Sequence, residues 1–214
     1  MSWLKIVFEG LKRTLAGIAR HNSKGFAMTG LETRYRGPAR LFHWSMAVFI
    51  VATIPAGFVM IQEGIDRSLQ DGLFLFHKNV GVLLLVLVVV RILYRWRHPA
   101  PPLPDDLPAW QHMAARLSHV GLYALLLIMP IAGYVRVKAG GFPIESLDAL
   151  GVPSLVPRSD AVAEIAKMIH YFGAYAITAL IALHVGAAAH HGILRRDGVF
   201  SRMWPPLGGS DRGV

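Results

Sequence analysis

The stretch MIHYFGAYAITALIALHVGAAAHHGIL, residues 168–194, decides the fold of this chain. It contains no Asp, Glu, Lys or Arg, and an apolar helix of about 20 residues is enough to cross a bilayer. His170 and His184 stand 14 positions apart within it. At about 100° per residue, this separation returns to within about 40° of the same helix face and rises about 21 Å. The stretch therefore predicts a membrane-spanning helix that presents two imidazoles to one face at two depths.

Three further apolar stretches are long enough to span a membrane: residues 41–61, 73–90 and 117–135. Only the second carries a charge, Lys78, and we expect Lys78 and Arg91 to extend towards opposite membrane faces. The whole chain is 54% apolar and 16% charged, which is unlike an ordinary soluble domain. The sequence therefore predicts an all-α integral membrane protein, a four-helix bundle in contact with lipid.

Basic residues are distributed unevenly between the helix ends. Eight lie in residues 1–40, four in 91–116 and four after residue 194, whereas residues 62–76 hold one basic and three acidic residues. Because cytoplasmic segments are enriched in Lys and Arg, we expect a multi-pass membrane protein with both termini cytoplasmic. This distribution accounts for the formal charge of +9, so no nucleic acid partner is expected. The expected parts are an amphipathic cytoplasmic arm (1–40), a transmembrane domain (41–194) and a cytoplasmic tail (195–214).

The chain has 10 histidines and no cysteine. The absence of cysteine excludes disulfides, iron–sulfur clusters, thiolate metal sites and covalently attached c-type haem. A histidine inside a membrane helix is costly and is usually functional. Helix direction places His43 and His184 near the cytoplasmic face, and His77 and His170 near the periplasmic face. Two imidazoles on opposite sides of a haem iron close both axial positions, which suits electron transfer.

A third histidine makes the choice of the ligand pair near the cytoplasmic face ambiguous. His119 lies near the start of the third span, at about the depth of His43 and His184. Depth alone does not decide whether His43 or His119 faces His184 across a haem. A His119 that is not a ligand could hydrogen-bond a haem propionate or a quinone carbonyl.

Basic side chains are also expected near His77 and His170, at the periplasmic face. These candidate catalytic residues are Lys78, Arg136, Lys138 and Lys167. Together they would form a basic rim that attracts an anionic donor. The alternative is that they only anchor helix ends at the membrane interface. Residues 136–167 form a connection long enough to fold over this end of the bundle as a lid.

Near the cytoplasmic face, Arg36 and Arg40 are candidates for holding haem propionates.

Four motifs in order resemble the bacterial cytochrome b561 family. They are RGPARLFHW (36–44), HKNVG (77–81), LSHVGLYALLLIMPIAGY (117–134) and HYFGAYAITALIALHVGAAAHH (170–191). The resemblance covers about residues 35–205. It implies a four-helix bundle of the bacterial inner membrane with two haems b, and it carries the ligand roles onto His43, His77, His170 and His184. By resemblance, His43 rather than His119 is then the partner of His184.

The resemblance also implies a function. One studied branch of the family is similar to a superoxide oxidase, which takes an electron from periplasmic superoxide and delivers it to ubiquinone. We therefore expect an oxidoreductase that joins a periplasmic one-electron donor to ubiquinone. The first alternative is a quinone-linked subunit, similar to a hydrogenase cytochrome b, that docks a periplasmic or membrane redox partner. A histidine-lined transporter without redox chemistry is a more distant alternative.

Overall fold

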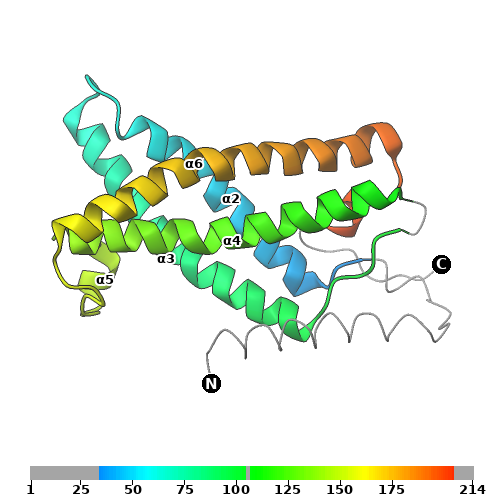
Figure 1. Cartoon of the computed structure of the whole chain (residues 1–214), viewed down its shortest axis with the longest axis horizontal. Coiled ribbons are helices and arrows are strands. Elements are labelled where there is room, and N and C mark those ends of the chain that lie inside the picture. Colours follow the sequence, from blue (N-terminus) through cyan, green and yellow to red (C-terminus); the bar gives the residue numbers. More distant parts are fainter. Residues whose placement is uncertain (1–33, 105–106, 205–214) are drawn as a thin grey trace. The chain divides into compact units, whose positions relative to one another are not determined.

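The computed structural model describes residues 34–104 and 107–204, and helices are the only regular elements in these ranges. Four are long: α2 (Gly37–Val59), α3 (Arg67–Arg97), α4 (Ala109–Ala139) and α6 (Asp160–Ala189). The short elements are α5 (Glu145–Ala149), the π-helical turn η3 (His190–Arg195) and the 3₁₀ turn η4 (Phe200–Arg202). All four long helices are long and apolar enough to cross a membrane (Figure 1). The predicted all-α fold with four spans is confirmed. The predicted amphipathic arm lies mostly outside the described residues.

The helices are longer than the apolar stretches that predicted them. Side-chain caps mark the starts of α3 and α6: the side chain of Asp66 accepts a hydrogen bond from the amide of Leu69 at 3.0 Å, and Ser159 caps α6 in the same way. Helices α2 and α4 begin beside a proline without a side-chain cap. Polar residues then continue each helix beyond its apolar part. The expected connection 136–167 is consequently too long, because α4 continues to Ala139 and α6 begins at Asp160.

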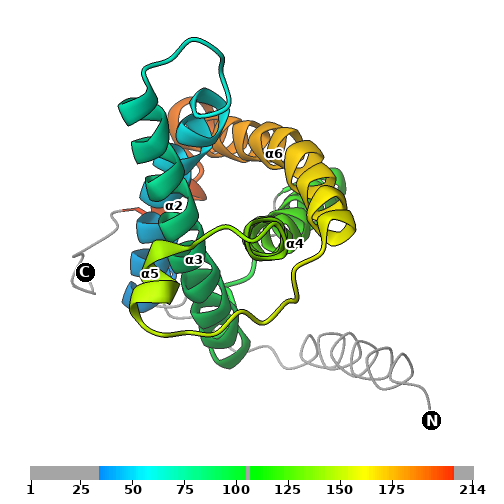
Figure 2. The ribbon, with the colours of Figure 1, turned by 90° about the vertical axis from the view of Figure 1, so that its left-hand side faces the viewer.

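The long helices pack as two pairs. Helix α4 packs mainly on α6 and α2 on α3, while contacts between α3 and α4 join the pairs (Figure 2). A small core of Met46, Leu84 and Val88 lies between α2 and α3, with apolar side chains of α4 against it. At most 17% of the residues in the most apolar window of any span are buried. The remaining residues of these windows are half-buried or exposed, which agrees with helices that also contact lipid.

The two ends of the bundle carry different extra elements. The α5 end, defined here by α5, has its short helix fixed to α3: Asn79 accepts a hydrogen bond from the amide of Ser146 at 2.8 Å. The η3 end, defined by η3 and η4, holds both ends of the described chain. There the indole of Trp44 donates to the carbonyl of Met203 at 2.9 Å, and Arg34 donates to the carbonyl of Trp204 at 2.8 Å.

The position of Arg91 differs from the one expected. Its side chain does not extend to a membrane face but is buried, at 7% exposure, between three helices. It donates to the carbonyl of Ala39 in α2 at 2.9 Å and to the hydroxyl of Tyr123 in α4 at 3.0 Å. The hydrogen-bond partners satisfy the guanidinium locally, so it does not need to reach water.

Candidate functional site

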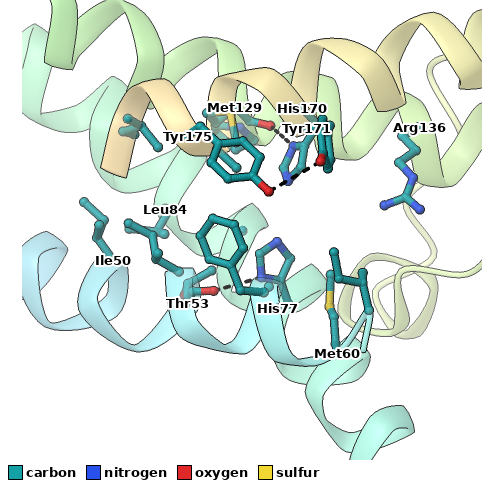
Figure 3. A pocket seen from close by; sticks show the side chains of 18 of the residues that line it. Ile50, Thr53, Met60, His77, Leu84, Met129, Arg136, His170, Tyr171 and Tyr175 are labelled. Carbon is teal, nitrogen blue, oxygen red and sulfur yellow. Dashed lines mark hydrogen bonds between the residues drawn. The ribbon is translucent and has the colours of Figure 1, made fainter. Parts of the chain in front are cut away.

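Two histidines from different helix pairs face each other near the α5 end. His77 of α3 and His170 of α6 have ring centroids 5.9 Å apart and ring planes inclined at 76° (Figure 3). Metal–imidazole bonds are about 2.0–2.1 Å long, so two imidazoles on opposite sides of one metal have centroids about 6 Å apart. The observed spacing therefore fits two axial ligands of a single haem iron.

Backbone hydrogen bonds fix the orientation of both rings. Nδ1 of His77 lies 3.1 Å from the carbonyl oxygen of Thr53, and Nδ1 of His170 lies 3.0 Å from that of Met129. A carbonyl can only accept, so Nδ1 of each ring must carry the proton and donate it. The lone pair is then on Nε2, which is the arrangement that a metal-ligating histidine needs.

Glycines make room for the same two rings. A Cβ placed on Gly57 would lie 2.7 Å from Cε1 of His77, and one on Gly133 would lie 3.2 Å from Cε1 of His170. Each imidazole thus packs directly against the backbone of the neighbouring helix. The rings are held from behind by a glycine and a carbonyl, with Nε2 left available.

The facing rings line a cavity of about 370 Å³. This volume lies in the range of about 300–1,000 Å³ that is usual for ligand pockets. Its walls are mostly apolar and come from α2, α3, α4 and α6, while Arg136 and Lys167 are the cations in its lining. A large flat apolar ring system with two carboxylates, such as haem b, matches this combination of residues.

The η3 end holds a cluster of three histidines. The ring of His184 lies 6.2 Å from that of His43 and 5.7 Å from that of His119, measured between centroids. The structure thus brings together the three residues that depth had grouped, and His184 is adjacent to both others. Either neighbour lies at a spacing that suits a ligand pair.

Three arginines lie at the start of α2, the helix that carries His43, and they differ in burial and contacts. Arg40 is buried at 7% exposure, whereas Arg36 is exposed at the start of α2. The buried Arg91 of α3 donates to Ala39 of α2 and Tyr123 of α4, so it joins these three helices at the η3 end. Of the two arginines proposed to hold propionates, Arg40 therefore lies within the bundle.

Most of the proposed basic rim is paired with carboxylates. Nζ of Lys78 lies 2.6 Å from Glu145, Lys138 forms an ion pair with Asp148, and Nζ of Lys167 lies 3.1 Å from Glu164. Burial alone would raise the pKa of Glu145, but hydrogen bonds from Lys78 and Asn79 outweigh it and lower that pKa. The hydrogen bond from Lys138 likewise lowers the pKa of Asp148. Lys78 and Lys138 thus fasten α5, which weakens their predicted role in attracting an anion.

Two tyrosines that line the cavity were not predicted from the sequence. Tyr171 and Tyr175 line it beside His170, and their hydroxyls lie 3.4 Å apart (Figure 3). The ring of Tyr175 also contacts that of Phe58 across the cavity, with centroids 5.4 Å apart. Their spacing of one helical turn next to His170 was the available signal. The supporting groups Thr53 and Gly57 had no comparable signal, because they lie on another helix.

Within the described ranges, no group of three or more His, Cys, Asp or Glu side chains is placed to hold a bare metal ion. The membrane histidines occur instead as facing rings at spacings near 6 Å. This arrangement suits a flat metal complex between two rings better than a closed coordination sphere.

Comparisons with known proteins agree with this geometry. Residues 34–206 match the family model described as prokaryotic cytochrome b561. Cytochrome b561 homolog 2 of Escherichia coli (strain K12) is 32% identical over 197 residues, covering 88% of this chain and all of the relative. Cytochrome b561 homolog 1 of the same organism is 30% identical over 165 residues, covering 76% of this chain and 92% of the relative. A probable superoxide oxidase CybB of Yersinia pestis is 28% identical over 170 residues, covering 76% and 91%.

The family match spans the four long helices and both histidine clusters. A family of cytochromes b implies haem b as the cofactor. The spacing of the facing rings of His77 and His170 is consistent with it. The chain therefore belongs to the prokaryotic cytochrome b561 family, and it is a bacterial membrane cytochrome b of electron transfer.

Proposed function

We propose that this cytochrome holds two haems b and passes electrons across the inner membrane from a periplasmic one-electron donor to ubiquinone. The single observation that carries the proposal is the pair His77 and His170. Their rings face each other at 5.9 Å, and both Nδ1 atoms are engaged by backbone carbonyls, which leaves Nε2 for iron. Bound haem iron supplies reversible one-electron chemistry at this position.

The second haem of the proposal lies between His184 and His43. The family resemblance favours His43, because it lies in the motif RGPARLFHW, and the 6.2 Å ring spacing is compatible with that choice. His119 is then a neighbour that hydrogen-bonds a propionate or a quinone carbonyl. Since α6 carries His170 and His184 about 21 Å apart along its axis, one helix provides a ligand to each site.

The residues of the chain give these sites three properties. A haem held by both histidines of a pair would exchange electrons rather than bind small molecules at its iron. The mostly apolar cavity walls offer few polar groups to bind water around the His77 site. Arg40 lies three residues before His43 on α2, and Arg91 donates to the carbonyl of Ala39, four residues before His43. Both buried arginines would therefore place positive charge near His43 and favour the reduced state of a haem held there.

The orientation follows from the basic residues and remains part of the proposal. Both ends of the described chain meet at the η3 end, which is the basic side by residue count and hence the cytoplasmic side. The α5 end is then periplasmic. A donor would approach the His77 site there, and ubiquinone would be reduced near the His43 site.

Superoxide is the donor that we propose. The support is the printed name of the Yersinia pestis relative, a probable superoxide oxidase, together with the cations Arg136 and Lys167 at the cavity of the His77 site. An anionic one-electron donor is attracted to such a region. Two superoxide anions would each give up one electron and leave as O2, and these two electrons with two protons would convert one ubiquinone to ubiquinol.

The test uses purified protein in detergent or lipid. A reduced-minus-oxidised spectrum together with haem and protein quantification should give two haems b per chain. Mixing the oxidised protein with superoxide and a ubiquinone analogue should reduce the haems rapidly and then produce quinol. Haems that stay oxidised in superoxide would contradict the proposed donor, and a chain without b-type bands would contradict the cytochrome.

A second candidate function is an electron-transfer subunit that docks a redox protein. It is favoured by large apolar side chains exposed on the connection around α5: Phe142 (66%), Leu150 (77%) and Leu155 (79%). Exposed apolar residues outside the spans suit a protein or membrane contact. In this case superoxide would not reduce the haems, and only a protein partner would reduce them. The double variant Leu150→Ser, Leu155→Ser would then slow reduction by that partner.

A further inference from the structure

One arginine lies in the cavity of the His77 site without an acidic partner in the described part of the chain. Arg136 lines the cavity together with both facing histidines. Figure 3 shows its guanidinium beside the gap between the rings of His77 and His170. Its side chain forms no hydrogen bond or ion pair with any residue of the described ranges.

The neighbouring cations differ from Arg136 in this respect. Lys78 and Lys138 are each held by a carboxylate of the α5 connection, and Lys167 is exposed and paired with Glu164. The carboxylates of Glu145, Asp148 and Glu164 are therefore already paired with lysines. A half-buried guanidinium beside apolar walls is costly unless an anion faces it.

Haem b supplies such an anion, because its edge carries two propionate carboxylates. A guanidinium binds a carboxylate through two parallel N–H donors, which fixes the orientation of the partner as well as its charge. We propose that Arg136 binds a propionate of the haem held by His77 and His170. Arg136 is thus a positioning residue of that haem and raises its reduction potential, which adds to the attraction of an anionic donor proposed for it above.

The inference rests on the proposed haem at this histidine pair and makes a further claim about one side chain. A simpler role is that Arg136 stabilises the carboxyl end of α4, where cations interact favourably with the helix dipole. Lys138 lies in the same last turn of α4 but does not line the cavity. It is therefore a matched control, since a helix-dipole role would affect both residues alike.

The experiment compares Arg136→Gln, Arg136→Lys and Lys138→Gln as purified holoproteins. Redox titration measures the midpoint potential of each haem, and resonance Raman spectroscopy measures the propionate bending band. In Arg136→Gln, the potential of one haem should fall and its propionate band should shift, while the other haem is unchanged. Arg136→Lys should keep most of the potential but still shift the band, because the ammonium cannot bind through two parallel donors. Lys138→Gln should match the unmodified protein in both measurements.

Several results would overturn the inference. Unchanged potential and band in Arg136→Gln would do so, as would equal effects of Arg136→Gln and Lys138→Gln. If Arg136 serves a soluble anion, chloride would change the haem potential in the unmodified protein, and Arg136→Gln would abolish that change with the propionate band intact. If Arg136→Gln does not accumulate, the band of Arg136→Lys decides alone. If His77→Ala retains every haem, the proposed function fails as well, which separates the two cases.

Discussion

The imidazole of His77 lies directly against Gly57, where a Cβ atom would be only 2.7 Å from Cε1 of the ring. Real Cβ atoms do not approach a neighbour this closely, so a side chain at position 57 must displace the ring. The same ring donates from Nδ1 to the carbonyl of Thr53, one turn earlier on α2. One turn of α2 therefore holds the imidazole of His77 in position: Gly57 leaves room for the ring, and the carbonyl of Thr53 accepts its hydrogen bond.

Gly57→Ala should selectively remove or distort the haem held by His77. The added methyl group displaces a ring that packing and its hydrogen bond otherwise fix, and overpacking of this kind costs about 1–3 kcal/mol. The measurement is haem content per chain, with the spectrum of each haem resolved by redox titration. Gly72→Ala in α3 is the control, because its Cβ would meet no atom within 4 Å. If both variants retain two unchanged haems, the close approach has no functional importance.

His43→Ala should lose one of the two haems, whereas His119→Ala should keep both. The two rings flank His184 at similar distances, so the prediction depends on the family motif around His43. Haem quantification of both variants decides the matter, with His184→Ala as the reference for loss of that site. A haem lost from His119→Ala and retained in His43→Ala would reverse the ligand assignment.

Tyr123→Phe should destabilise the bundle by about 1–3 kcal/mol, because it leaves Nε of the buried Arg91 without its hydrogen-bond partner. Thermal unfolding followed by the loss of haem absorbance measures the effect. Tyr94→Phe is the comparison, since Tyr94 packs against Phe42 and His98 by its ring and its hydroxyl forms no hydrogen bond within the described residues. Equal melting temperatures of the two variants would show that the Tyr123 hydroxyl contributes nothing.

The contacts of α5 should loosen only in acid. The pKa values of Glu145 and Asp148 are lowered from their ordinary values of 4.5 and 3.8, chiefly by hydrogen bonds from Lys78 and Lys138. A carboxyl whose folded pKa is lowered contributes stability above its unfolded pKa and loses it as the pH falls through the folded value. Hydrogen exchange in residues 140–159 should therefore be constant, after correction for intrinsic rates, from about pH 7 to about pH 5 and accelerate below the ordinary carboxyl range.

Glu145→Gln provides the control for this pH dependence. It removes the charge that Lys78 pairs with, so the connection should exchange faster already at neutral pH and show a smaller acid step. An acid step of the same size in Glu145→Gln and in the unmodified protein would assign the effect to other groups.

The sequence by itself determined the spans and the depths of the histidines. Long apolar stretches force a helix in lipid, because every backbone amide and carbonyl must be satisfied within the segment. The fixed rise of that helix then places His170 and His184 at two levels, and the family motifs identify the class of cofactor. These properties depend only on residues close together in the chain.

The tertiary structure alone decided how the rings are held and which cations are neutralised. Thr53 and Gly57 of α2 support His77 of α3, and Glu145 of the α5 connection pairs with Lys78, across separations that no local pattern encodes. Arg91 is buried for the same reason, since its partners Ala39 and Tyr123 lie on two other helices. Hydrogen bonds and ion pairs between helices depend on the rotation and depth of each helix against its neighbours, so they appear only once the bundle has formed.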